Sequence, residues 1–370
     1  MKLTIVAGEA SGDLHAAKVI HELKTLDPSL TAFGIGGDLL AEEGVELLHH
    51  AREMAIVGLF NVLRHLRFFR RVFDELIARI EQERPDAVML VDYPEFNLRV
   101  ATRCHELGVK VLYYISPQVW AWRRGRVKKI AKIVDHMLVI FPFEETFYRE
   151  HGVPVTYVGH PLIDELHEIT PPPHSAPGSG HLRIALMPGS RRHEVHSLLP
   201  PMLDAVADLQ RDHEVDAFVI QAPTISSAEL LEQMKASHTF VRIVPYDGGL
   251  SLAGADVALS SSGTATLEAA IVDTPVVVMY RLSPLTYLAA RRLVKVPHFS
   301  LVNIVAGAEV VPELIQHDVN GARIAKEVRA IVEPAANARL REGLALVRKR
   351  LGERGASRRA AEEIFRMLRE

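Results

Sequence analysis

The sequence has little cysteine, little net charge and no long apolar run, and each shortage argues against a class of protein. The chain of 370 residues contains one cysteine, Cys104, which cannot form an internal disulfide and fits a cytosolic protein. The formal net charge of −3 gives no overall signal for nucleic-acid binding. No apolar stretch approaches the roughly 20 residues that cross a bilayer. The first residues, MKLTIVAGEASGDLH, predict a strand and a glycine turn and not a secretion signal.

Several ligand-binding motifs are also missing. The stretch GEASGDLH (8–15) departs from the G-x-G-x-x-G fingerprint of dinucleotide-binding proteins, so a dehydrogenase is the least favoured enzyme class. HEVH (193–196) lacks the spacing of the H-E-x-x-H zinc motif. No Asp-x-Asp pair is present to hold a metal ion on a nucleotide diphosphate. The sequence therefore predicts no metal site and no cofactor, and a diphosphate would be neutralised by positive side chains and helix ends.

Short apolar runs alternate with helical patterns along the whole chain. Runs such as KLTIVAG (2–8) and LRIALMPGS (182–190) are apolar at successive positions, which is typical of parallel strands buried on both faces. The stretch TPPPHSAPGSG (170–180) is the clearest linker. We therefore expect an α/β protein of two Rossmann-like domains facing each other across a cleft. The expected divisions are residues 1–169, a linker at 170–181, residues 182–340, and C-terminal helices at 341–370.

The turn after the first predicted strand is rich in glycine and polar residues. It contains Gly8, Glu9, Ser11, Gly12 and Asp13. The glycines allow a tight turn and the close approach of a ligand to the backbone. Ser11 or Asp13 would also serve as the N-cap of the helix that follows, so this turn alone is weak evidence for a binding site.

A second candidate junction is VDYPEFNL (91–98). Asp92 ends an apolar strand, and Pro94 blocks continuation of that strand. Because ligands bind at the carboxyl ends of parallel strands, Asp92 is a candidate general base. A helix cap or turn former is an equally good interpretation. Glu95 and Asn97 are near enough in sequence to orient Asp92 or to bind substrate hydroxyls.

In the second predicted domain, MPGSRRHEV (187–195) ends a strand and begins a helix. Ser190 is expected to cap this helix. Arg191 lies beside the helix N-terminus, where the helix dipole is already positive, so a bound anion would relieve an unfavourable interaction. Both residues are candidates for contact with a phosphate.

The stretch SSGTATLEAA (261–270) has the same strand-to-helix character. Backbone N–H groups near Gly263 and Thr264 are placed to receive a diphosphate at the helix N-terminus. Glu268, one turn further, suits the paired hydroxyls of a ribose. Helix capping by Ser262 or Thr264 is the structural alternative, and it is compatible with ligand binding.

The segment MAIVGLFNVLRHLRFFRRVF (54–73) contains no acidic residue. One stripe of its apolar residues keeps helical spacing and predicts an ordinary core face. Phe68 falls among the arginines on the opposite side, which suits a surface facing anionic lipid. The candidate membrane contacts are Phe60, Leu63, Arg64, Arg67, Phe68 and Arg71. A second basic segment, WAWRRGRVKK (120–129), would contact membrane or phosphate, or form a basic helix face.

Taken together, the motifs resemble those of the lipid-A-disaccharide synthases, inverting bacterial glycosyltransferases of the GT-B type (glycosyltransferase family 19). The resemblance runs nearly from end to end. It is carried by GEASGDLH, GIGG, DYPEFN, YYISPQVWAWR, FPFE, VGHPL, MPGSRRHEV, SSGTATLE and VVPELIQ, in that order. So many motifs in one order are far more specific than any of them alone.

The resemblance implies a reaction and a set of roles. The donor would be UDP-2,3-diacylglucosamine and the acceptor 2,3-diacylglucosamine 1-phosphate, giving the β-1′,6-linked disaccharide 1-phosphate and UDP with inversion. Asp92 would be the base. The UDP side would comprise Ser190, Arg191, Ser262, Gly263, Thr264, Glu268 and Asn303, and the acceptor side Gly8, Glu9, Ser11, Gly12, Asp13 and Asn97. The enzyme would be cytoplasmic and dock on the anionic inner membrane, and its C-terminal helices would pack on its own N-terminal domain or cross to a partner in a homodimer.

Two other functions are compatible with parts of the sequence. One is another UDP-sugar enzyme of GT-B shape, such as a UDP-N-acetylglucosamine epimerase or a soluble-sugar transferase, which would need neither a lipid-facing surface nor detergent. The other is a nucleotide-binding membrane adaptor, in which substitution of Asp92 would have no measurable effect.

Overall fold

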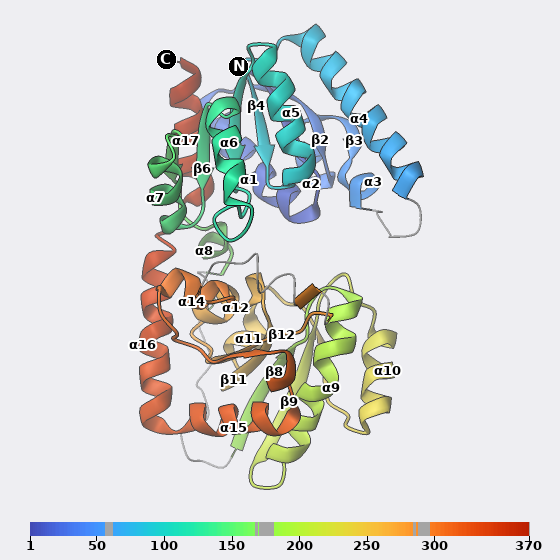
Figure 1. Ribbon diagram of the computed structural model, residues 1–370, viewed down its shortest axis with the longest axis vertical. Coiled ribbons are helices and arrows are strands. Elements are labelled where there is room, and N and C mark those ends of the chain that lie inside the picture. Colours follow the sequence, from blue (N-terminus) through green and yellow to red (C-terminus); the bar gives the residue numbers. More distant parts are fainter. Residues whose placement is uncertain (56–61, 167–168, 170–180, 284–285, 288–296, 370) are drawn as a thin grey trace. The chain divides into compact units, whose positions relative to one another are not determined.

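The computed structural model describes residues 1–369 except 56–61, 167–168, 170–180, 284–285 and 288–296 (Figure 1). The chain forms two compact units. Unit 1 contains Met1–Pro161 and Glu353–Glu370, and unit 2 contains Leu162–Gly352. Residues 162–169 and 341–352, which the sequence groups with the N-terminal domain and the C-terminal helices, thus fall in unit 2.

Unit 1 is built on a parallel sheet that has seven strands among the described residues, in the order β3-β2-β1-β4-β5-β6-β7. The strands are β1 (Lys2–Ala7), β2 (Thr31–Gly36), β3 (Glu46–His50), β4 (Ala87–Val91), β5 (Lys110–Tyr114), β6 (His136–Val139) and β7 (Val155–Tyr157). Every residue of β4 is buried, as expected for a strand covered on both faces.

The helices of unit 1 connect these strands and cover the sheet. They are α1 (Ala10–Leu26), α2 (Asp38–Glu42), α3 (Ala51–Ala55), α4 (Val62–Glu83), α5 (Pro94–Glu106), η1 (Arg124–Arg126), α6 (Val127–Ile133), α7 (Pro142–Glu150) and α17 (Ala356–Arg369), while α8 (Pro161–Leu166) spans the boundary to unit 2. In α4, Leu76 and Ile80 of the predicted core stripe are buried, as is the neighbouring Val72, whereas Leu66 of the same stripe is exposed.

The last helix of the chain, α17, belongs to unit 1 although all of unit 2 precedes it in sequence (red in Figure 1). Its small buried residues, such as Ala360 and Ala361, allow it to pack closely against α1. The Lys110 ammonium donates a hydrogen bond to the Met367 carbonyl (2.9 Å), and the Arg359 guanidinium donates to the Val158 carbonyl (2.8 Å). In this single chain, α17 completes the chain's own unit 1.

Unit 2 repeats the architecture with a parallel sheet of six strands in the described part of the chain, in the order β10-β9-β8-β11-β12-β13. The strands are β8 (His181–Met187), β9 (Glu214–Gln221), β10 (Arg242–Pro245), β11 (Val257–Ser261), β12 (Val276–Tyr280) and β13 (Glu313–Ile315). The helices are α9 (Arg192–Leu209), α10 (Ser227–Ser237), α11 (Leu250–Ala253), α12 (Thr264–Ile271), α14 (Leu301–Ala306), η2 (Gln316–Asp318), α15 (Gly321–Val332) and α16 (Pro334–Arg350).

Each sheet has a point where the strand order reverses. In unit 1 it lies between β1 and β4, and in unit 2 between β8 and β11. In open α/β sheets, the carboxyl ends of the two strands that flank this point form the usual ligand site. The four junctions singled out in the sequence follow these four strands. Among the described residues, no helix is both long enough and apolar enough to cross a membrane.

Candidate functional site

The backbone at the end of β4 is unusual. Asp92 and Tyr93 both adopt left-handed conformations, with φ of 46° and 48°. The Asp92 N–H donates to the Tyr114 carbonyl (3.1 Å), which ties this turn to the end of β5. Two successive left-handed residues other than glycine are costly and are concentrated at functional sites. The turn sets the Asp92 side chain at the carboxyl edge of the sheet.

The carboxyl group of Asp92 lies in an environment that favours its neutral form. Burial, and to a lesser extent the negative charge of Glu9, raise the pKa of Asp92 to about 6, although the hydrogen bond from the Tyr93 N–H opposes the shift. Glu9 itself is exposed at the turn after β1. A carboxylate with a pKa close to neutrality is well suited to accept a proton.

Asn97 and Tyr113 fix the Asp92 turn by hydrogen bonds to its backbone. The Asn97 amide donates to the carbonyls of Asp92 (2.8 Å) and Val91 (3.2 Å), and the Tyr113 hydroxyl donates to the Asp92 carbonyl (2.6 Å). Both side chains are completely buried. Of the two roles that the sequence offered Asn97, the structure supports orientation of the Asp92 turn.

Asp13 has a structural partner that the sequence does not reveal. Its carboxylate accepts hydrogen bonds from the backbone N–H groups of Gly37 (2.6 Å), Leu39 (3.1 Å) and Leu40 (3.2 Å), at the start of α2. A side chain on Gly37 would clash with this carboxylate, which explains the last glycine of GIGG. The prediction that Ser11 or Asp13 caps α1 is wrong, because the N-cap of α1 is Glu9 and Asp13 caps α2 instead.

The rest of the first turn is packed around the Asp92 junction. Gly8 lies against the ring of Tyr93, since a Cβ there would be 2.6 Å from a ring carbon. Gly12 is buried beside Val91, whereas Ser11 is exposed at the sheet edge. Gly8 therefore allows the close approach of the two turns that the switch point requires.

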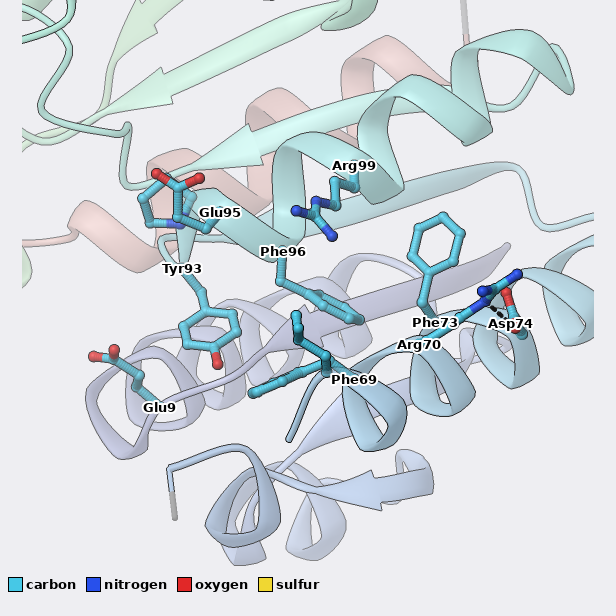
Figure 2. Close-up of a pocket in the computed structure, with 11 residues that line it drawn as sticks. Glu9, Phe69, Arg70, Phe73, Asp74, Tyr93, Glu95, Phe96 and Arg99 are labelled. Carbon is cyan, nitrogen blue, oxygen red and sulfur yellow. Dashed lines mark ion pairs between the residues drawn. The ribbon is translucent and has the colours of Figure 1, made fainter. Parts of the chain in front are cut away.

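A pocket of about 770 Å³ opens beside Asp92, between α4 and α5. Its lining residues are Glu9, Leu66, Phe69, Arg70, Phe73, Asp74, Tyr93, Pro94, Glu95, Phe96 and Arg99. Figure 2 shows the rings of Phe69, Phe96 and Tyr93 grouped near its centre, with Glu9 at one end and the Arg70–Asp74 pair at the other. We call this the aromatic pocket. The spacing of Phe69 and Phe73 indicates a core stripe, so the sequence does not reveal that they line a pocket.

The exposed face of α4 is basic, but Phe68 does not belong to it. Phe68 is half-buried and packs edge-on against Phe69 (5.6 Å between ring centroids) and His49 (6.4 Å). The prediction that Phe68 is exposed is therefore wrong, because the ring packs against the core, although the Arg71 guanidinium does lie over it, 5.7 Å from the ring centroid. Arg67 and Arg71 are exposed as predicted. Phe60 lies outside the described residues, as do the side chains of Leu63 and Arg64.

In unit 2, the N-terminus of α9 is capped by a carboxylate of the helix itself. The Glu194 carboxylate accepts from the N–H groups of Ser190 (3.1 Å) and Arg191 (3.2 Å) and pairs with the Arg191 guanidinium (3.0 Å). The expected cap at Ser190 is wrong, since Arg191 is the N-cap residue and Glu194 provides the capping carboxylate. The charge conflict at Arg191 is thus relieved within the chain, and its exposed side chain remains at the end of β8.

The N-terminus of α12 differs from that of α9. Its N-cap is Gly263, and within the described part of the chain no side chain caps it. The Ser262 hydroxyl donates instead to the Phe299 carbonyl (3.1 Å), so the capping alternative for Ser262 and Thr264 is wrong. A Cβ on Gly263 would meet open space. This helix end presents backbone N–H groups at the switch point of unit 2.

Glu268 on α12 is held by a residue that the sequence analysis missed. The Tyr246 hydroxyl donates to a Glu268 carboxylate oxygen (3.1 Å), and burial raises the pKa of Glu268. Tyr246 follows β10 in the stretch PYDGG, so its place after a predicted strand was an available signal. The pair can present one carboxylate and one phenol to sugar hydroxyls.

Asn303 is completely buried, and its amide is used within the fold. It donates to the Val311 carbonyl (2.9 Å) and to Glu313 (2.8 Å), and it accepts from the N–H groups of Val310 (2.8 Å) and Val311 (3.0 Å). Glu313 in turn accepts from the Phe299 and Ser300 N–H groups. These bonds support a positioning role for Asn303, in which it holds the loop that contacts Ser262.

Two further motifs meet at a buried acid in unit 1. The Glu144 carboxylate accepts from the Ser116 hydroxyl (2.6 Å), the Trp120 indole (3.0 Å) and the Phe141 N–H (3.2 Å). Burial raises the pKa of Glu144 to about 7. FPFE thereby fixes the loop SPQVWAW at the carboxyl end of β5, a role that the sequence analysis did not predict.

Two parallel-sheet α/β units, each with a switch point at the carboxyl ends of its strands, form the GT-B fold. Solved structures agree with this fold. The UDP-GlcNAc 2-epimerase from Neisseria meningitidis matches with a TM-score of 0.67 at 13% identity, over 99% of this chain and 100% of that one. MurG from Acinetobacter baumannii matches with a TM-score of 0.59 at 14% identity, over 99% of each. At such identities these structures show the fold alone.

The family follows from sequence comparison. The model of the lipid-A-disaccharide synthetase family matches residues 3–365. The lipid-A-disaccharide synthase of Anaeromyxobacter dehalogenans (strain 2CP-C) is 45% identical over 100% of this chain and 98% of that protein. That of Geobacter sulfurreducens is 43% identical over 99% and 97%. The chain belongs to the lipid-A-disaccharide synthetase family, and it is a glycosyltransferase of lipid A biosynthesis.

Proposed function

We propose that this enzyme transfers a diacylglucosaminyl group from UDP-2,3-diacylglucosamine to 2,3-diacylglucosamine 1-phosphate, with Asp92 as the base. The family relation supports the reaction. The observation that supports the role of Asp92 is its place at the switch point of unit 1, on a left-handed turn, with a pKa raised to about 6. At neutral pH most Asp92 side chains are ionised and able to take a proton.

The chemistry is a single displacement. Asp92 removes the proton of the acceptor's 6-hydroxyl as that oxygen attacks the anomeric carbon of the donor from the side opposite UDP. The new C–O bond forms as the bond to the diphosphate breaks, which inverts the anomeric centre. The proton ends on Asp92 and the electron pair on UDP.

The residues of unit 2 stabilise the leaving group in this proposal. The N–H groups at Gly263 and Thr264 receive the diphosphate, because no side chain caps α12. Arg191 would release Glu194 to reach the same anion. Glu268, held by Tyr246, binds the ribose hydroxyls.

The test is a transfer assay in nonionic micelles with both diacyl sugars and EDTA present, in which UDP and disaccharide are measured by mass spectrometry. Wild type should form disaccharide, and Asp92→Asn should lose at least about a hundredfold in rate. The matched control is Asp86→Asn, at the opposite end of β4, where an amide can still accept from the Lys2 N–H. Full activity of Asp92→Asn would contradict the assignment of Asp92 as the base. Formation of an epimerised UDP-sugar without disaccharide would contradict the proposed transfer reaction.

The exposed side of α4 is our proposed membrane contact. Leu66 is 54% exposed, and the side chains of Arg70 and Arg71 are 85% and 65% exposed. Wild type should sediment with phosphatidylcholine vesicles only when they contain phosphatidylglycerol, and less so at high salt. Arg67→Glu with Arg71→Glu should abolish this binding, whereas Arg358→Glu on α17 should not. Equal binding by the double variant would contradict the assignment.

Exchange of the C-terminal helices between two subunits is the remaining proposal. The α17 helix packs on the unit 1 of its own chain here, and the same contacts would form with a partner's unit 1. Light scattering should then give the mass of a dimer. A monomer at every protein concentration would rule out exchange.

A further inference from the structure

Glu95 lines the aromatic pocket and also interacts with a group of arginines. The Glu95 carboxylate accepts hydrogen bonds from Arg123 (3.0 Å) and Arg126 (2.8 Å), and Arg99 adds a third positive charge nearby. These interactions lower the pKa of Glu95, those of Arg126 being the strongest. We call Arg99, Arg123 and Arg126 the arginine cluster.

The cluster has more positive charge than its own carboxylate neutralises. Glu95 supplies one negative charge against three arginines, and its side chain is 68% exposed, so it can move aside. Arg123 is also fixed over the Trp122 ring, 4.3 Å from its centroid. A phosphate monoester carries about −1.5 to −2 charges at pH 7 and offers three acceptor oxygens, which suits this group better than one carboxylate.

The aromatic rings of the pocket provide an apolar surface next to the charged arginine cluster. The pocket lining includes the rings of Phe69, Phe73 and Phe96, and the Phe96 centroid lies 6.3 Å from that of Phe69 and 6.2 Å from that of Phe73. Leu66 lies exposed on its lining. A volume of about 770 Å³ is in the range of roughly 300–1,000 Å³ that small-molecule sites occupy. Its partner must be amphiphilic, because Glu95 and Arg99 line the same pocket as the rings.

We propose that the arginine cluster binds the 1-phosphate of the acceptor while the aromatic pocket takes one of its acyl chains. Tyr93 and Glu9 line the pocket and also contact or influence Asp92, so an acceptor held there lies beside the base. This inference rests on the proposed function and identifies the specificity residues for the acceptor.

The first test compares two acceptors, the 1-phosphate and the same diacylglucosamine with a free 1-hydroxyl, in nonionic micelles without anionic lipid. Arg99→Gln and Arg126→Gln should each raise the KM for the phosphorylated acceptor roughly tenfold to a hundredfold. The KM for the 1-hydroxyl acceptor and the Kd for UDP should not change. The control is Arg103→Gln, one turn further along α5, which pairs with Glu81 and Glu106 and lines no part of the pocket.

The second test addresses the acyl chain. Leu66→Trp narrows the pocket at an exposed position, so the fold should be kept, and KM should rise more for long-chain than for short-chain acceptors. Leu346→Trp, at an exposed position in unit 2, is the control. Equal effects on all chain lengths would overturn this part of the proposal.

The outcomes separate the two proposals. No disaccharide from wild type would defeat the proposed function itself. Disaccharide from wild type, with arginine variants that weaken both acceptors equally or neither, would defeat only the phosphate assignment. An effect of Arg99→Gln or Arg126→Gln that appears only with phosphatidylglycerol in the micelles would assign the cluster to lipid headgroups and also overturn it.

Discussion

At the scale of single residues, the repulsion between the Glu9 and Asp92 carboxylates should affect the pH profile of the reaction. Burial and Glu9 together hold the pKa of Asp92 at about 6, so activity that needs ionised Asp92 falls as pH drops through that value. Glu9→Gln removes a negative charge and should shift the acidic limb of kcat/KM to lower pH. Glu106→Gln, on the surface of α5, should leave it in place. An unshifted limb in Glu9→Gln would show that burial alone sets this pKa.

The same carboxyl group should cost the protein stability. Folding raises the pKa of Asp92 from the ordinary value of 3.8 to about 6. Ionisation of Asp92 therefore lowers the free energy of unfolding, by an amount that grows from about pH 4 and is complete above about pH 6. Asp92→Asn should therefore stabilise unit 1 by about 2–3 kcal/mol at about pH 8 and by much less at about pH 4. Asparagine also tolerates the left-handed backbone. Denaturant unfolding at the two pH values checks this. An equal increase in the free energy of unfolding at both values would show that the stabilisation comes from the backbone preference of asparagine and not from the charge.

The place of Asp92 could be predicted because a strand, a carboxylate and a proline follow one another in sequence. The partners of Asp13 could not be predicted, because they are backbone groups of a distant segment. Asp13 meets N–H groups 24 to 27 positions away, and nothing in the local pattern reveals them. A polar residue next to a glycine turn therefore suggested a ligand contact where the structure has a capping contact.

At the scale of elements, the loop between β5 and η1 depends on Glu144. Glu144→Ala would leave the Ser116 hydroxyl, the Trp120 indole and the Phe141 N–H without this acceptor in a buried region. We expect the free energy of unfolding of unit 1 to fall by about 3 kcal/mol or more. Denaturant unfolding monitored by tryptophan fluorescence would measure this loss. Glu145→Ala, which breaks only an ion pair with Arg149, should cost less than about 1 kcal/mol. Similar losses in both variants would contradict the role of Glu144.

The helix starts show where element-level prediction fails. For α9 and α12 the expected caps were serine or threonine before or at the first turn, as helix statistics favour. In α9 the cap comes from Glu194, three residues after the N-cap, and in α12 there is none. The difference between the two ends matters for function, because only tertiary structure shows which helix end is left for a ligand.

At the scale of the whole molecule, the two parallel sheets were predictable because their strands are continuous apolar runs between helical patterns. The discontinuity of unit 1 was not evident from periodicity, since α17 lies beyond all of unit 2 in sequence. A chain that stops after Gly352 would uncover α1 and should unfold unit 1 while unit 2 stays folded and binds UDP. Circular dichroism and calorimetric UDP titration would check this. A single cooperative loss of both units would contradict their independence.

The order of α17 in the chain also has a consequence during synthesis. A ribosome makes most of unit 1 first, then all of unit 2, and only then the helix that covers α1. Throughout translation of unit 2, unit 1 therefore lacks α17, and the face of α1 that this helix covers stays accessible to chaperones and proteases. A messenger RNA that is cut short would give a product whose unit 2 can fold but whose unit 1 lacks its last helix, so we expect proteases to remove truncated copies.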